Sequence, residues 1–539
     1  MKLLLFFFIV VASLLSNELK SDLTLQWLTE QPRSITKDFY IWRYLDQNIT
    51  PEETIKVLGQ AKRVNNRLLY KYAKKLQHKD TSKIVKCMNM KGKELVSQNP
   101  DCIEVGMSVY KATKLSTNDL DSVIRKIQKK YPNSAKKFSI LNSNIPFTKL
   151  ISSNSEVFFD IFNKCGTSYR RNFFNHNLPK LTIKRLQKNK KFSKTIKIIV
   201  ISKDLSKMQK SLFDIEINSL EYQSIFYLAI NAIRHHKKIL ALTLLEAGYE
   251  NAYFRYEKDK VLFWQYKLTE DKKYLELLSK SWNNNIYSLL AHEYLNTQPT
   301  NILYNIETNQ TFKSSFNYND PFSWINILND SKTLTKAKMG RYDDILNHKN
   351  SLGYLSFLKE KVFKYEKSYF ITPYQDIINK YSIQRQALMY AIARQESRFV
   401  HTAISASYAM GAMQIMPFLS KAIAKEIKEP YDIYKQLDPK TNLKYSNHHL
   451  NFLESRLKHP LLIAYAYNGG IGLLKKVLQK GLFKKGKYEP FLSMELFPVD
   501  ETREYGKKVL ANYFIYKNYL DKKNKIKISS LFKDIKSPY

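Results

Sequence analysis

Glu396 is the residue of this chain whose position best suits acid–base chemistry. Leu388 and Ile392 lead by steps of four to Glu396, so the carboxylate continues the apolar stripe of a predicted helix. The β-branched residues after Arg398 predict that this helix ends soon, which places Glu396 in its last turn, at the negative end of the helix dipole. Burial and dipole both raise the pKa of a carboxyl group, which allows it to act as a general acid near neutral pH. The stripe alone fits a surface glutamate at a helix end equally well.

Several short blocks around and after Glu396 carry the other polar groups. They are Glu396-Ser397, GAMQIMP at residues 411–417, AYNGG at residues 466–470 and ETREY at residues 501–505, with the single residue Ser405 between the first two. In order and spacing these blocks resemble those of the soluble, goose-lysozyme-like lytic transglycosylases. The resemblance covers residues 367–519, and four blocks in order over about 110 residues rarely arise by chance.

The resemblance implies a non-hydrolytic cleavage of the β-1,4 bond of peptidoglycan. Glu396 would donate a proton to the glycosidic oxygen and then accept one from the C6 hydroxyl of the sugar, which closes onto C1 and leaves a 1,6-anhydromuramoyl end. No second catalytic carboxylate, cofactor or metal is expected. The residues that would bind substrate are Ser405, Met413, Gln414, Tyr467, Asn468 and Glu501. Two other classes stay open: a lysozyme-like hydrolase and a non-catalytic wall-binding scaffold.

Some positions depart from the family pattern. His449 stands at or beside the place of a usual tyrosine, and Ala412, Ile471 and Leu473 replace a usual Leu, Pro and Arg. These residues concern packing and the rim of the site more than Glu396. We therefore expect activity to survive the changes.

Composition predicts an all-α protein, and a length of 539 residues leaves room for more than one domain. Only 14 Gly and 16 Pro occur in 539 residues, which favours long helices over a sheet architecture. Helical segments in series up to residue 296 predict a curved superhelix or solenoid, because such hairpins bury their faces by stacking on neighbours. Gly248 is expected to end one of these helices. By analogy with the family, a lysozyme-like, mostly α catalytic domain follows. The predicted units are a leader at residues 1–16, a superhelical domain at 17–296, a linker and small helical subdomain at 297–366, the catalytic domain at 367–520 and a basic tail at 521–539.

The N-terminus reads as a secretory leader. Lys2 precedes an apolar run that ends at Leu15, which is shorter than the about 20 residues of a membrane span. We predict export to the periplasm after cleavage, with no integral membrane span. An uncleaved N-terminal anchor is the alternative.

Export bears on the three cysteines. Cys87 and Cys102 enclose a short polar segment and can bridge in an oxidising compartment, which leaves Cys165 over. We predict a disulfide between Cys87 and Cys102. Three reduced core cysteines are the alternative, since pairing does not follow from sequence alone.

The net charge of +40 allows three interpretations: nucleic-acid binding, attraction to an anionic membrane or wall, and a solvated basic surface. The leader argues against nucleic acid as a partner. Peptidoglycan glycan strands carry carboxylates that would attract a basic protein. We expect a monomer, and contacts with peptidoglycan-synthesis proteins stay open.

Overall fold

The computed structural model describes residues 23–76, 79–308, 311–533 and 535, and the predicted leader lies outside these residues. Almost all regular structure in them is helical. The strands of the described residues, β1 (Ile302–Leu303) and β2 (Ser368–Tyr369), form one short parallel pair. No helix in the same ranges is both long and apolar enough to cross a membrane.

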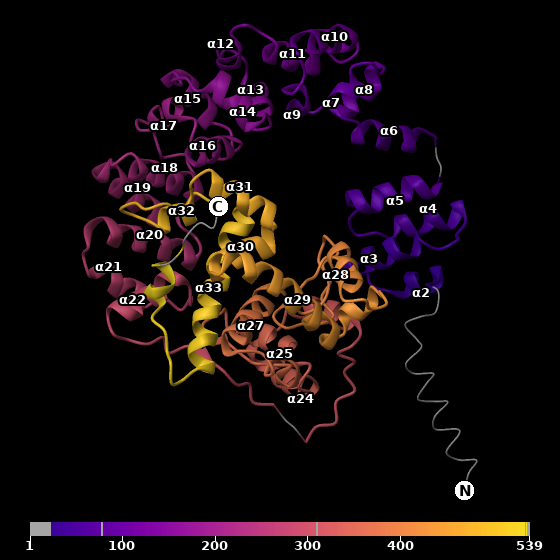
Figure 1. The fold of residues 1–539 in the computed structure, drawn as a ribbon, viewed down its shortest axis with the longest axis vertical. Helices are drawn as coiled ribbons and strands as arrows, with labels where there is room; N and C mark the ends of the chain where they lie inside the picture. Colours follow the sequence, from indigo (N-terminus) through magenta and orange to yellow (C-terminus); the bar gives the residue numbers. More distant parts are fainter. Residues whose placement is uncertain (1–22, 77–78, 309–310, 534, 536–539) are drawn as a thin grey trace.

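The first half of the chain is an arch of short helices. Many begin at the polar caps that the sequence offers, such as Thr50 before Pro51 and Ser116 before Thr117. The helices are α2 (Leu25–Glu30), α3 (Ile35–Tyr44), α4 (Pro51–Gly59), α5 (Asn66–Leu76), α6 (Lys79–Asn89), α7 (Gly92–Leu95), α8 (Pro100–Gly106), α9 (Val109–Ala112), α10 (Thr117–Ile127), α11 (Pro132–Leu141), α12 (Pro146–Ile151), α13 (Ser155–Phe162), α14 (Thr167–Tyr169), the π-helix η1 (Arg170–Phe174), α15 (Lys180–Gln187), α16 (Phe192–Ile201), α17 (Ser206–Lys210), α18 (Tyr222–Arg234), α19 (Lys238–Asn251), α20 (Arg255–Thr269), α21 (Lys273–Ser279) and α22 (Ile286–Tyr294). Successive helices pack on their neighbours along the chain, and in Figure 1 they run from indigo through magenta over the top of the molecule.

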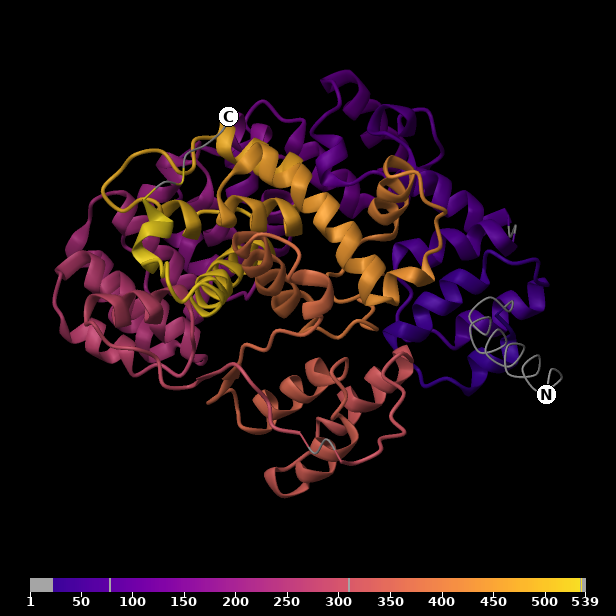
Figure 2. The ribbon, with the colours of Figure 1, turned by 60° about the horizontal axis from the view of Figure 1, so that its bottom comes forward.

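A small helical unit follows β1 and lies to one side of the helices of the last third of the chain, as Figure 2 shows. It contains α23 (Pro321–Asp330), the 3₁₀ helix η2 (Lys336–Lys338), α24 (Gly340–Ile345) and α25 (Leu352–Val362). Gly353 at the start of α25 touches the backbone just after the Glu396 helix, where a Cβ would lie 2.6 Å from the carbonyl oxygen of Arg398. The unit therefore abuts the end of the helix that carries Glu396.

The last third of the chain is built on two helices that pack together, α27 (Ile383–Ser397) and α33 (Asp500–Leu520). Its elements are β2, α26 (Gln375–Ile378), α27 (Ile383–Ser397), α28 (Pro417–Glu426), the 3₁₀ helix η3 (Tyr434–Leu437), α29 (Pro439–Leu457), α30 (Pro460–Gly469), α31 (Ile471–Gln479), α32 (Phe491–Glu495), α33 (Asp500–Leu520) and the 3₁₀ helix η4 (Ile528–Phe532). Helix α33 packs against both α27 and α30, so it is buried along most of its length.

The chain closes on itself, because α3 and α5 return to the last third of the chain (Figure 1). Arg67 donates to the carbonyl oxygen of Ser407 at 2.7 Å, and the hydroxyl of Tyr408 donates to the carbonyl oxygen of Asp38 at 3.3 Å. Around them lie the rings of Phe39, Tyr40, Trp42, Tyr408 and Tyr434, which we call the aromatic junction. The sequence had given no indication of this closure.

Three local predictions can be compared with the structure. Cys87 and Cys102 are joined by a disulfide, and Cys165 is buried as a free thiol. The prediction that Gly248 ends a helix is wrong, because Gly248 lies inside α19. A glycine inside a helix lowers the free energy of unfolding by only about 1 kcal/mol relative to alanine, which the fold tolerates. Within the predicted basic tail, Ile528 in η4 is fully buried and Phe532 packs on Phe491.

Candidate active site

Glu396 lies in the last turn of α27, as predicted. The helix ends at Ser397, and Arg398 follows in the left-handed conformation with φ 54°. The side chain is only partly exposed, and its Oε1 accepts a hydrogen bond from the hydroxyl of Tyr505 at 2.7 Å. Burial raises the pKa of the Glu396 carboxyl to about 7; the hydrogen bond from Tyr505 opposes this shift, and the negative charge of Glu501 adds to it. The group is thus partly protonated at neutral pH, as a general acid requires.

The end of α27 is held by buried contacts on both sides. Glu360 of α25 is 2% exposed, and its carboxylate pairs with Arg394 at 2.7 Å and with Arg398 at 2.8 Å. The hydroxyl of Ser397 donates to the carbonyl oxygen of Ala412 at 2.8 Å, which joins the helix to the GAMQIMP block. These bonds fix the direction in which the neighbouring Glu396 points.

Ser405 opens a tight turn beside the site. Its hydroxyl oxygen accepts from the backbone N–H of Ala409 at 2.9 Å, so the structure uses it to shape the turn. The bridges from Ile404 to Met410 and from Met410 to Ile415 continue the turn into a small antiparallel ladder. Ser405 itself stays half-buried.

The GAMQIMP block lies against α29. Gly411 has φ +83°, and a Cβ there would come within 2.3 Å of the carbonyl oxygen of Gln436, so only glycine fits. Asn442 holds the block from the other side, accepting from the N–H of Met413 at 2.9 Å and donating to the carbonyl oxygen of Met410 at 3.0 Å. The side chain of Met413 is fully buried, so Met413 contributes to the site through its backbone. The Gln414 amide donates to the carbonyl oxygens of Ala403 at 3.0 Å and Gly411 at 2.8 Å.

The AYNGG block closes the α30 side of the site. Tyr467 donates to the carbonyl oxygen of Met413 at 2.8 Å, so it supports the GAMQIMP block rather than Asn468. Asn468 is oriented from α33: its Oδ1 accepts from the Thr502 hydroxyl at 2.7 Å, and its amide lies 3.4 Å from Oε1 of the exposed Glu501. His449 lies with its ring 5.6 Å from that of Tyr467, where the family pattern led us to look for an aromatic contact.

Three contributing residues escaped the sequence analysis. Tyr505 belongs to the ETREY block, but the sequence analysis assigned it no role. In the structure its hydroxyl hydrogen-bonds Glu396 directly. Asn442 and Glu360 lie in segments without any motif. Only the block around Tyr505 offered a signal. No group of three or more His, Cys, Asp or Glu side chains suited to a metal ion is found in the part of the chain that the structure describes.

Together, fold and site define a helical superhelix that carries a lysozyme-like domain with one partly buried acid. Residues 374–489 match the family model described as "Transglycosylase SLT domain", so this part of the chain is an SLT domain. The chain is 28% identical over 206 residues to the soluble lytic murein transglycosylase of Escherichia coli (strain K12), which covers 37% of this chain and 31% of that protein. It is 35% identical over 139 residues to the putative soluble lytic murein transglycosylase of Haemophilus influenzae (strain ATCC 51907 / DSM 11121 / KW20 / Rd), covering 25% of this chain and 22% of that protein. The match thus spans a third or less of these curated relatives.

The fold extends the likeness to nearly the whole chain. The 70 kDa soluble lytic transglycosylase SLT70 of Escherichia coli superposes with a TM-score of 0.53 and 18% identity, over 95% of this chain and 90% of that one. The complex of the 70 kDa soluble lytic transglycosylase with bulgecin A gives a TM-score of 0.52, also at 18% identity, over 92% and 88% of the two chains. The predicted fold class, an all-α superhelix followed by a lysozyme-like domain, is thereby confirmed.

Proposed function

We propose that this protein is a peptidoglycan lytic transglycosylase that cleaves the β-1,4 bond between MurNAc and GlcNAc without water and leaves 1,6-anhydroMurNAc ends. The observation that carries the proposal is the carboxyl of Glu396, which lies in an SLT domain, has a pKa raised to about 7 and is contacted by the Tyr505 hydroxyl. A single acid of this kind can serve in both halves of the reaction.

In the first half, protonated Glu396 donates its proton to the glycosidic oxygen as the bond from C1 to that oxygen breaks. The carboxylate that forms is stabilised by the hydrogen bond from Tyr505. In the second half, the carboxylate accepts the proton of the C6 hydroxyl while that oxygen bonds to C1. The acid is regenerated, and no water, cofactor or metal takes part.

The substrate would lie between the Ser405 turn, the GAMQIMP block and α33. Asn468, held by Thr502, and Gln414, held by two carbonyl oxygens, are oriented before substrate arrives. We assign these two side chains and Ser405 to the hydroxyl and acetamide groups of the sugars. Glu501 lines the rim, and Met413 and Tyr467 support the wall of the site.

We place the reaction in the periplasm, in cell-wall turnover and remodelling. The basis is the leader pattern at residues 1–16 together with a net charge of +40, which would draw the protein to the carboxylates of the wall. The same charge predicts that cleavage slows as salt is added, because screening weakens the attraction. Binding to peptidoglycan-synthesis proteins and a monomeric state belong to this proposal.

The test is mass spectrometry of the fragments that the protein releases from purified sacculi. Wild type should release anhydro ends, which are lighter by one water than hydrolytic ends. Glu396→Gln should release none while it keeps the wild-type circular dichroism spectrum. Glu501→Gln is the matched control: it should slow release by about tenfold at most and leave the product unchanged, because Glu501 is exposed and does not bond the reacting acid.

Each other outcome selects one of the remaining classes. Hydrated reducing ends from wild type, lost equally in Glu396→Gln and Glu501→Gln, would mark a two-carboxylate hydrolase. Binding to sacculi with no release by any variant would mark a scaffold. Release by folded Glu396→Gln would refute the role of Glu396.

A further inference from the structure

Helix α33 presents different groups on different faces. Glu501 and Tyr505, four residues apart, face the active site. Asp500, Glu504 and Lys507 lie on another face, which meets the superhelical domain. A displacement of this helix would therefore change the contact between Tyr505 and Glu396.

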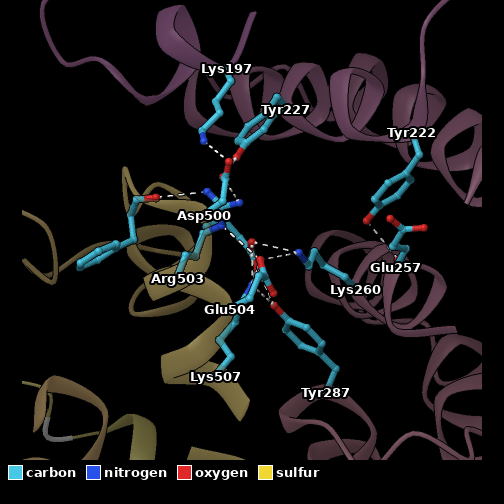
Figure 3. Close-up of polar contacts among 12 residues, drawn as sticks. Lys197, Tyr222, Tyr227, Glu257, Lys260, Tyr287, Asp500, Arg503, Glu504 and Lys507 are labelled. Carbon is cyan, nitrogen blue, oxygen red and sulfur yellow. Dashed lines mark hydrogen bonds and ion pairs between the residues drawn. The ribbon is translucent and has the colours of Figure 1, made fainter. Parts of the chain in front are cut away.

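Side chains from four superhelix helices contact that second face (Figure 3). We call this contact the ionic junction; it joins Lys197 of α16, Tyr227 of α18, Lys260 of α20 and Tyr287 of α22 to Glu495, Asp500, Arg503, Glu504 and Lys507. Four cationic side chains thus meet three carboxylates. Most are almost fully buried, with Glu495 2%, Lys507 4%, Arg503 5% and Lys260 6% exposed.

Of the two lysines that the superhelix contributes to the ionic junction, Lys260 is more deeply buried than Lys197. Its ammonium lies 3.1 Å from Oε1 of Glu504 and 3.7 Å from Oε2 of Glu495. Lys507 contacts the same two carboxylates at 3.1 Å, but burial lowers the pKa of Lys507 to about 8, so its charge is the less secure one. Without Lys260, the buried carboxylate of Glu495 and the partly buried carboxylate of Glu504, whose side chain is 29% exposed, would depend on cations of α33 alone. An uncompensated buried charge is strongly unfavourable, so Glu504 would move toward water.

Glu504 is the residue before Tyr505, and the helix transmits such a movement. Gly506, the residue after Tyr505, lies flat on the ring of Tyr465, where a Cβ would come within 2.2 Å of a ring carbon. The helix therefore has no room to deform locally at this point. A shift of Glu504 has to displace the Tyr505 hydroxyl as well.

We propose that Lys260 is a positioning residue for the reaction at Glu396: by pairing with Glu504 and Glu495 it fixes the first turns of α33 and holds the Tyr505 hydroxyl on the catalytic carboxylate. The superhelical domain thereby contributes to chemistry that takes place in the catalytic domain. This inference rests on the proposed function for the reaction itself, but its structural part, the hold on Tyr505, does not.

The expected effect on pH dependence has a definite sign. The groups that face Glu396 are Tyr505 and Glu501 from α33 and Tyr467 from α30. Tyr505 hydrogen-bonds the ionised form, so losing this bond raises the pKa of Glu396 further. The negative charge of Glu501 raises the pKa of Glu396, so moving Glu501 away would lower it. This effect is the smaller one, because Glu501 is exposed and solvent screens its charge. Activity requires protonated Glu396, so the alkaline limb of the pH–rate profile should move to higher pH.

The experiment compares kcat/KM against pH on glycan oligomers for wild type, Lys260→Met, Tyr505→Phe and the double variant. Lys260→Met should lower kcat by about tenfold or more and move the alkaline limb upward, in the direction of Tyr505→Phe. In the double variant the limb should move no further than in Tyr505→Phe, because both changes remove the same bond.

Arg255→Met is the matched control. Arg255 belongs to the same helix as Lys260 and pairs with the buried Asp259 at 2.8 Å, and its hydrogen bonds go to Asp259, Ser281 and Leu277, all within the superhelix. It should destabilise the superhelix and leave the limb unchanged. The proposal would be overturned if the alkaline limb of Lys260→Met lay at the same pH as that of Arg255→Met and the kcat of Lys260→Met were unchanged from wild type.

Two further measurements keep the result decisive. If Lys260→Met does not fold, Lys197→Met at the rim of the junction should give a smaller shift of the same sign, and no shift would count against the proposal. If wild type shows no activity, the proposed function fails, yet the hold on Tyr505 is still measurable. The gain in melting temperature from Glu396→Gln at pH 8 should then be larger with Lys260→Met than without it, and an equal gain would refute the coupling.

Discussion

The superhelical domain contacts the lysozyme-like domain through two junctions of opposite chemistry. At the aromatic junction, the ring of Phe39 meets that of Tyr408 edge-on at 5.7 Å, and Tyr40 stacks on Tyr434 at 6.1 Å. At the ionic junction, Lys260 and Lys507 meet the carboxylates of Glu495 and Glu504. The first holds the turn of Ser405, and the second holds α33 with Tyr505.

The difference suggests a division of tasks. Apolar burial stabilises in proportion to area and tolerates small rotations, so the aromatic junction can close the chain without fixing a side chain precisely. Buried ion pairs stabilise weakly, but they are costly to disturb, so they favour one arrangement. We infer that the junction that holds α33 and Tyr505 is ionic because the bond to Glu396 needs a fixed geometry more than it needs free energy.

The largest effect on stability should come from the aromatic junction. Tyr408→Ala removes a fully buried ring that touches Phe39 and Trp42, so the free energy of unfolding should fall by about 3–5 kcal/mol. Denaturant unfolding would measure it, with Tyr253→Ala, whose side chain is 87% exposed, as the control expected within about 0.5 kcal/mol. A loss below about 1 kcal/mol would mean that the N-terminal helices do not stay docked.

Acid should separate the two junctions. Pairing with Lys260 and Lys507 outweighs burial and lowers the folded-state pKa of Glu504 and Glu495, and that of Asp500 is lowered by Lys197 and Arg503. Such carboxylates stabilise the fold above their unfolded pKa near 4, and this stabilisation is lost as pH falls through the folded pKa. At the other junction, burial raises the pKa of Asp38, so the sign there is reversed.

The free energy of unfolding contributed by the ionic junction should therefore fall between pH 6 and pH 3. Hydrogen exchange, corrected for its intrinsic pH dependence, should show protection falling in α33 before it falls in α3. Equal loss in the two helices would remove the distinction drawn here.

What the sequence could predict depended on local pattern. The periodicity that ends at Glu396 placed it in the last turn of a helix. The disulfide was predicted from the short polar segment between Cys87 and Cys102 together with the expected export, and the structure has it. The helical class followed from the scarcity of Gly and Pro. Each of these features is determined within a few turns of chain.

What the sequence could not predict was contact between distant segments. The hydroxyl of Tyr505 reaches Glu396 across 109 residues, and Lys260 reaches Glu504 across 244. Periodicity shows that such side chains lie on a face, but not which partner that face meets. Met413 shows the converse: its motif indicated a groove residue, whereas packing against α29 buries its side chain.

The smallest effect should come from a change of Glu396 itself, with both junctions left intact. Glu396 has a folded pKa of about 7, above its unfolded value near 4.3, so the folded state holds the extra proton between these values. The free energy of unfolding therefore falls as pH rises through this window, and the penalty is complete above pH 7. Glu396→Gln carries no such penalty and should be more stable than wild type at pH 8, by on the order of 2 kcal/mol after allowance for partial exposure, and indistinguishable from it at pH 4. Thermal unfolding of both proteins across this range would measure the gain. A difference in stability between the two proteins that stays constant with pH would show that the pKa of Glu396 is not raised by folding. The bond from Tyr505, which the ionic junction holds in place, would then have no raised pKa to oppose.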